Sequence, residues 1–102
     1  MIENHKKILA KLHNIYKEKN EKYGNSFADN IKEWGYIAAG TIISQKFSRL
    51  KTLIKQNNLF DNGTDESLQD TLIDLANYCL ITAMELEETK KNNNNIKDKT
   101  DA

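Results

Sequence analysis

The sequence of 102 residues contains no proline, four glycines and one cysteine. Without proline, no residue removes a backbone N–H from a helix interior, and this favours long helices. The cysteine, Cys79, cannot form a disulfide within the chain. It lies in an apolar segment, so we expect it to be a small buried residue. The two histidines lie far from it in sequence, so no zinc-binding pattern is present.

Net charge and long apolar segments are also lacking. Fifteen basic residues balance fifteen acidic ones. A protein that coats nucleic acid is normally basic, so this balance argues against general nucleic-acid binding. No apolar run of about 18 residues and no basic-then-apolar leader is present, so we expect no membrane partner and a cytoplasmic location. A single domain of this length buries only about 60–65% of its unfolded surface, so we expect a homo-oligomer. No nucleotide-binding glycine loop or nucleophile elbow is present.

Apolar residues recur at helical spacing along most of the chain, which predicts an all-α fold. We expect a compact bundle of three long helices, over about 2–23, 37–56 and 65–89, with one short helix over 27–34. Residues 1–89 then form a single helical domain. Asparagine and lysine dominate residues 90–102. Such a segment cannot bury enough surface to offset its ordering entropy, which predicts a disordered polar tail.

Small and polar residues predict where the helices end. Gly24 and Asn25 can both adopt a positive φ, which predicts that the first helix ends there with a left-handed cap. Gly35 and Gly40 flank a short apolar segment and predict a close helix contact or a kink. The expected N-terminal caps, which supply a side-chain acceptor to the first turn, are Ser26 with Asp29 three residues later, and Thr64 or Asp65.

The fourth predicted helix has an apolar stripe and a polar arc. The stripe, which we expect to face the core, consists of Leu68, Leu72, Leu75, Cys79 and Leu86. The polar arc spans about 80° on the opposite side, at 100° per residue, and consists of Glu66, Asp70, Asp74 and Asn77. Acids at this spacing repel one another, and further apolar residues border the arc. Both observations count against a face that is simply solvated, so the arc has two interpretations: a solvated face or a functional one.

The third predicted helix supplies cations that could meet this arc. Lys46 falls within its apolar arc and Arg49 at the edge of that arc. A lysine in such a place either extends to solvent or meets a buried acid. One interpretation is an ion pair, Lys46–Asp70 or Arg49–Asp74, that joins two helices. The other is a pocket in which the cations hold phosphate and the carboxylates hold Mg²⁺ or ribose hydroxyls. The aromatic residues near the glycines serve either core packing or base stacking, and these are Tyr23, Phe27, Trp34 and Tyr36.

Three segments carry a resemblance to a known family: residues 19–27 (KNEKYGNSF), 46–50 (KFSRL) and 66–78 (ESLQDTLIDLANY). They resemble the nucleotide modification-associated domain 1 family of small helical phage and prophage proteins, over about Lys17 to Glu88. The resemblance implies a nucleotide-related role in a phage setting. A fainter likeness to the all-helical nucleoside triphosphate pyrophosphohydrolases rests on residues 70–74, where Thr71 stands in place of an acid.

We therefore expect a small phage-type nucleotide-binding protein that sequesters a nucleotide or a signalling nucleotide of host defence, rather than an enzyme. The expected ligand-binding residues are Lys46 and Arg49 for phosphate, Asp70, Asp74 and Asn77 for ribose, base or a metal, and Tyr23 and Gly24 for the wall of the site. One alternative is an Mg²⁺-dependent nucleotide hydrolase with Glu66, Asp70 and Asp74 as metal ligands and bound water as nucleophile. Another is a protein-binding inhibitor whose partner is a host defence protein.

Overall fold

Four α-helices form the protein in the computed structural model, which describes the backbone of residues 1–60 and 67–100 and the side chains of residues 1–60 and 67–94. The helices are α1 (Ile2–Tyr23), α2 (Ser26–Trp34), α3 (Tyr36–Lys55) and α4 (Leu68–Thr100). No strand occurs within these ranges. The predicted all-α fold of three long helices and one short helix is therefore confirmed.

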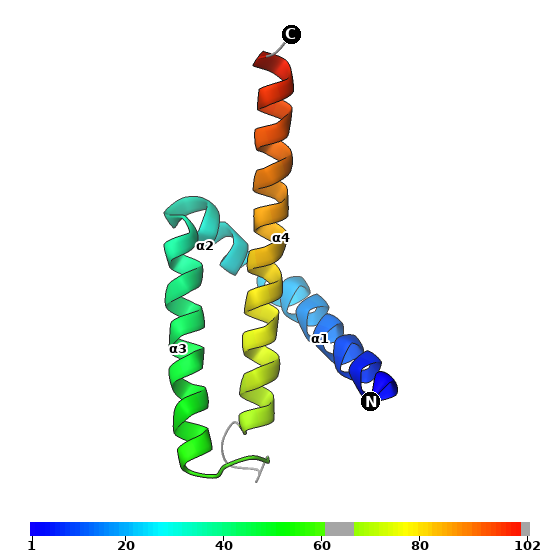
Figure 1. Ribbon diagram of the computed structural model, residues 1–102, viewed down its shortest axis with the longest axis vertical. Coiled ribbons are helices and arrows are strands. Elements are labelled where there is room, and N and C mark those ends of the chain that lie inside the picture. The colour runs from blue at the N-terminus through cyan, green and yellow to red at the C-terminus, as the bar shows by residue number, and fades with distance from the viewer. Residues whose placement is uncertain (61–66, 101–102) are drawn as a thin grey trace.

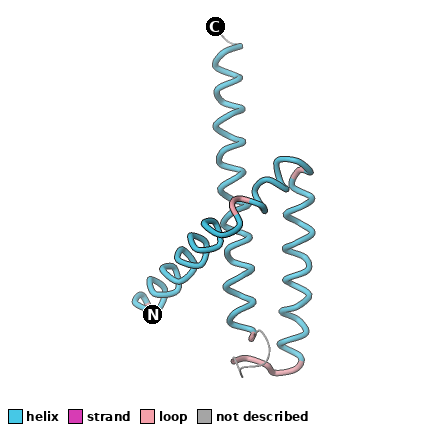
Figure 2. Tube along the Cα trace, turned by 180° about the vertical axis from the view of Figure 1, so that it is seen from behind, coloured by secondary structure: helices cyan, strands magenta, loops and turns pink. Residues whose placement is uncertain are grey.

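The helices α3 and α4 lie side by side and run in opposite directions (Figure 1). The short α2 joins the start of α3 to the middle of α4, and α1 diverges from the middle of α4 (Figures 1 and 2). The molecule measures 60 × 30 × 27 Å and has a radius of gyration of 16.9 Å, whereas a compact chain of this length has about 13 Å. The N-terminal part of α1 and the C-terminal part of α4 account for this difference because both extend beyond the bundle (Figure 1).

The core draws on all four helices. Its buried apolar side chains are Leu12, Ala28, Ile31, Ala39, Leu50, Leu53 and Ile73. The fourth helix adds polar residues to this interior, since Ser67, Thr71 and Asn77 are also buried and Thr71 has no exposed surface at all. The side of α4 that was expected to face either solvent or a ligand therefore packs against the rest of the chain.

The leucine stripe of α4 lies outward, so the prediction that it faces the core is wrong for the single chain. Leu72 is 48% exposed and Leu86 is 51% exposed, and Cys79 is exposed instead of buried. Ile73, on another side of the helix, is buried in its place. The reason is that α4 is apolar nearly all round, so the positions of its apolar residues do not identify which side meets α1 and α3.

Two glycines separate the first three helices. Gly24 (φ 68°, ψ −156°) follows α1 and Gly35 (φ 82°, ψ −176°) follows α2; this backbone region is almost confined to glycine. The helix end and the positive φ predicted at Gly24 are therefore confirmed, but its ψ of −156° is not that of the predicted left-handed cap. Ser26 lies inside α2, which begins after Asn25 without a side-chain cap, so the predicted Ser26 cap is wrong. No atom lies within 4 Å of a Cβ added at Gly40, so the predicted close contact does not occur there.

Both ends of α4 differ from their predicted positions. The helix begins at Leu68, directly after Ser67; the caps predicted at Thr64 or Asp65 fall in the segment outside the described residues. Its backbone continues to Thr100, beyond the end predicted near Thr89, and no proline interrupts it. No helix in the described part of the chain has the length and apolar character needed to cross a membrane.

Candidate functional site

A pocket of about 270 Å³ lies where the end of α1, the start of α2 and the middle of α4 meet. Only Gly24 and Asn25 separate α1 from α2, so the last turns of α1 and the first turn of α2 form adjacent walls. Residues of α4 close the third side. The lining residues are Tyr16, Lys19, Asn20, Tyr23, Gly24, Asn25, Ser26, Phe27, Ala28, Asp74, Asn77, Tyr78 and Ile81.

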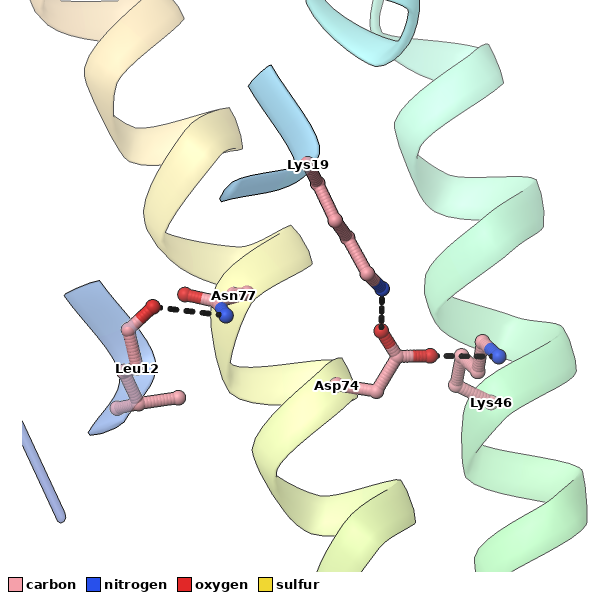
Figure 3. A network of polar contacts seen from close by, with 5 residues as sticks. All are labelled: Leu12, Lys19, Lys46, Asp74 and Asn77. Atoms are coloured by element: carbon pink, nitrogen blue, oxygen red, sulfur yellow. Dashed lines mark hydrogen bonds and ion pairs between the residues drawn. The ribbon is translucent and has the colours of Figure 1, made fainter. Parts of the chain in front are cut away.

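Asp74 is the carboxylate of this pocket, and two lysines from different helices contact it. Lys46 on α3 places its Nζ 2.6 Å from Oδ2, and Lys19 on α1 places its Nζ 3.4 Å from Oδ1 (Figure 3). The side chain of Asp74 is 17% exposed, a depth at which a carboxylate needs charged partners. Two ammonium groups from different helices therefore face one carboxylate beside the pocket.

An aromatic pair forms the apolar part of the pocket. The rings of Phe27 and Tyr78 meet edge to face, with centroids 4.8 Å apart and an interplanar angle of 68°. The Nζ of Lys46 lies 5.9 Å from the centroid of the Tyr78 ring, within the range of a cation–π contact. Tyr16 and Tyr23 add two more rings to the wall. The pocket therefore offers flat apolar surfaces beside a positive charge.

The first turn of α2 forms part of the lining of this pocket. The N–H of Asp29 donates a hydrogen bond to the backbone oxygen of Asn25 at 2.8 Å. This is the first backbone hydrogen bond of the α-helical pattern in α2. The N–H groups of Ser26, Phe27 and Ala28 precede it and have no acceptor within the helix, and all three residues line the pocket. A helix end of this kind favours an anion because the dipole and the donor groups act together.

Asparagines add to the polar lining, which contains Asn20, Asn25 and Asn77. Asn77 is buried and donates from Nδ2 to the backbone oxygen of Leu12 at 3.2 Å, which ties α4 to α1 (Figure 3). Asn20 on α1 has a buried Oδ1 without a hydrogen-bond partner in the described part of the chain. Its amide therefore keeps an acceptor at the edge of the pocket.

The structure brings together four of the residues that the sequence predicts for the site, since Tyr23, Gly24, Asp74 and Asn77 all line the pocket. Lys46 reaches Asp74 from outside the lining. Arg49 is half-buried on α3, does not line the pocket, and forms no hydrogen bond or ion pair with the described residues. The ion pair that joins α3 to α4 is thus Lys46–Asp74, a combination that neither predicted pairing contained.

Asp70 lies at the N-terminus of α4, where it forms a reciprocal cap with Ser67. Its Oδ2 accepts from Ser67 Oγ at 2.9 Å and from Ser67 N at 3.4 Å, and its own N–H donates to Ser67 Oγ at 3.2 Å. Glu66, the third predicted metal ligand, lies outside the described residues. In residues 1–60 and 67–94, no three His, Cys, Asp or Glu side chains lie together as a potential metal site.

The predicted site residues include four of the thirteen residues that line the pocket, and those missed include Tyr16, Lys19, Asn20 and Tyr78. Lys19 and Asn20 open the first segment that carries the family resemblance, and Tyr78 closes the third. The family motif therefore held the signal that helical periodicity did not. A long polar run such as residues 17–22 looks like a solvated helix end, whereas its last turn borders the pocket.

Comparison with known proteins identifies the family of this chain. The family described as nucleotide modification associated domain 1 matches residues 19–86, and the pocket residues from Lys19 to Ile81 fall inside the match. No curated protein matches the chain, and no solved structure does. The match spans more than half of the sequence and agrees with the resemblance carried by the three segments. The chain belongs to the nucleotide modification associated domain 1 family.

Proposed function

We propose that this protein binds a nucleotide in the pocket between α1, α2 and α4. One observation supports this most directly: the pocket sets an aromatic pair, Phe27 and Tyr78, beside a helix N-terminus and Lys19. A nucleotide combines a flat base with an anionic phosphate, and each part has a matching wall here. The volume of about 270 Å³ is near the lower end of small-molecule sites, which start at about 300 Å³, and so suits one nucleotide unit.

The phosphate contacts fall to Lys19 and to the first turn of α2 in this proposal. Lys19 is mostly exposed and only loosely paired, at 3.4 Å from Asp74, so it can turn to a ligand at little cost. The free N–H groups of Ser26 and Phe27 supply hydrogen bonds at the positive end of the helix dipole. The proposal thus transfers the phosphate role from Lys46 and Arg49 to groups that line the pocket.

The base and sugar contacts fall to α4 and to the end of α1. Tyr78 and Phe27 provide ring surfaces against which a base stacks. The free Oδ1 of Asn20 accepts from an amino group or a hydroxyl of the ligand. In this arrangement Lys46 positions Asp74 and balances its charge from outside the pocket.

The carboxylates support binding over metal-assisted hydrolysis. Asp74 has two lysine partners, and Asp70 is engaged by Ser67 at the end of α4. A divalent cation at Asp74 would face the two ammonium groups, which repel it. A protein that binds a nucleotide without converting it lowers the free concentration of that nucleotide. We therefore extend the proposal to sequestration of a nucleotide or signalling nucleotide by a phage-encoded protein.

Calorimetric titration tests the proposal directly. We expect saturable heat from at least one member of a panel of mono-, di-, tri- and cyclic nucleotides, and no loss of nucleotide on prolonged incubation with Mg²⁺. Lys19→Ala should weaken binding by about tenfold, the loss of roughly 1.4 kcal/mol. Lys17→Ala is the matched control, because Lys17 is exposed on the same helix and does not line the pocket. A folded sample that gives no heat with any nucleotide contradicts the proposal, and release of phosphate favours the hydrolase instead.

A further inference from the structure

The proposed binding site leaves the apolar stripe on α4 unexplained. Leu72, Cys79 and Leu86 are all exposed on it, and Leu68 and Leu75 are only partly covered. These positions follow one another at steps of three, four and seven residues, which is the spacing of a helix seam in a coiled coil. An exposed seam of this kind marks an interaction surface.

We propose that this stripe, defined as Leu68, Leu72, Leu75, Cys79 and Leu86, is the interface between two copies of this chain. The interface is isologous, so the α4 stripe of one copy packs on the α4 stripe of the other. The inference concerns an interaction surface and does not depend on the proposed nucleotide site.

The exposed area of the single chain supports a second copy. The chain exposes 7993 Å², whereas a compact monomer of 11.8 kDa exposes about 5,900 Å². The excess is roughly 2,100 Å² per chain. The projecting parts of α1 and α4 contribute to it (Figure 1), and its size is comparable to the area of about 1,000–2,500 Å² that each partner buries in an obligate homodimer.

The composition of the stripe also favours its own copy as the partner. Ala76 and Ala83 lie on the same side of α4 as Leu72, Cys79 and Leu86, and no charged residue occupies that side between Leu68 and Leu86. Small residues beside leucines let large side chains of one helix enter the gaps of another. A surface without charge needs no complementary partner and can pack on itself.

Three other exposed apolar groups are less suited to this role. Ile8 and Leu9 lie on the projecting part of α1, Phe47 and Ile54 lie on α3, and Trp34 and Ile37 lie near the α2–α3 turn. Lys51 lies over the ring of Phe47, 5.1 Å from its centroid, so charge interrupts the α3 surface. Among the residues whose side chains the structure describes, only α4 offers an apolar stripe that continues over five turns without a charged residue.

Light scattering on the full chain after gel filtration tests the interface. We expect a mass of twice 11.8 kDa for the wild type, and a mass of one chain for Leu72→Glu and for Leu86→Glu. Ile54→Glu is the matched control, because it makes the same change at an exposed residue of α3 and should leave the dimer intact. Circular dichroism confirms that each variant keeps its helices.

The reactivity of Cys79 provides a second measurement on the same samples. This thiol is exposed in the single chain and covered in the proposed dimer, so alkylation should be slow in the wild type and fast in Leu72→Glu. A wild type that has the mass of one chain and a rapidly alkylated Cys79 overturns the proposal, and so assigns the stripe to a different partner. A dimer that Ile54→Glu dissociates and Leu72→Glu does not also overturns it.

Discussion

Lys46 and Asp74 join α3 to α4 through a contact of 2.6 Å between Nζ and Oδ2. Both side chains are partly withdrawn from solvent, and Lys46 also lies over the ring of Tyr78. This pair explains why α4 can turn an acidic residue toward the interior. The lysine lies within the apolar arc of α3, where only a carboxylate partner compensates its burial.

Removal of either partner of this pair should destabilise the fold. Lys46→Ala leaves a carboxylate that is 17% exposed with only the longer contact to Lys19, at 3.4 Å, so the free energy of unfolding should fall by about 1–3 kcal/mol. Lys55→Ala, an exposed position on the same helix, should change it by less than about 0.5 kcal/mol. Urea unfolding of these variants, with Asp74→Ala and the double variant, yields a coupling energy of about 1 kcal/mol or more. Additive effects would mean that the two residues do not act as a pair.

Two glycine-to-alanine substitutions should have opposite signs. At Gly24 the added methyl group meets no neighbour within 4 Å, but φ is +68°, so backbone strain should cost about 1–3 kcal/mol. At Gly40, inside α3 and equally open, alanine should stabilise by about 0.5–1 kcal/mol. Thermal unfolding monitored by circular dichroism measures both. A stabilising Gly24→Ala would contradict the observed backbone conformation.

The cap at the start of α4 separates a structural role of Asp70 from a ligand-binding one. Ser67→Ala and Asp70→Ala should each lower the free energy of unfolding by about 0.5–2 kcal/mol. The first change leaves the N–H of Asp70 without its acceptor, and the second leaves the N–H and the hydroxyl of Ser67 without theirs. Asp70→Ala should leave the nucleotide affinity unchanged in calorimetry below the unfolding temperature. Loss of affinity in this variant, with wild-type affinity retained by Ser67→Ala, would assign Asp70 to the site instead.

The sequence predicted the helices well and the orientation of α4 poorly. Periodicity identifies a helix because apolar residues recur at 3.6-residue spacing, and this located α1 and α3 to within a few residues. The same periodicity in α4 predicted an apolar stripe that faces the core. In the single chain no other helix covers Leu72 and Leu86, which are exposed. Lys46 was singled out because a cation within an apolar arc needs a partner. The structure pairs it with Asp74, one helical turn from the predicted Asp70. The relative shift of two helices along their axes depends on tertiary packing, which the spacing of residues within one helix does not predict.

The pocket was predicted in part for a similar reason. Asp74 and Asn77 were found as polar residues on one side of a helix that is otherwise apolar. Lys19 and Asn20 lie in a polar stretch of α1 that resembles a solvated surface, and only the crossing of α1 over α4 brings them to the pocket. That crossing depends on contacts between residues distant in sequence, such as Leu12 with Asn77.

The contact between Asn77 and Leu12 predicts a pH-dependent variant. Asn77→Asp replaces the Nδ2 donor with a carboxylate oxygen that faces the backbone oxygen of Leu12, at a buried position near Asp74. Burial and these negative neighbours raise the pKa of the new carboxyl in the folded state above its unfolded value of about 3.9. The variant should therefore be less stable than the wild type by about 1–3 kcal/mol at pH 7.

Below both pKa values the carboxyl is protonated in both states and can donate to the Leu12 oxygen, so the deficit should shrink as the pH falls. Urea unfolding of both proteins at pH 7 and pH 4 measures the difference at each pH, so that a pH effect common to both proteins cancels. A deficit that stays constant or grows at pH 4 would mean that the Leu12 contact does not hold α1 against α4.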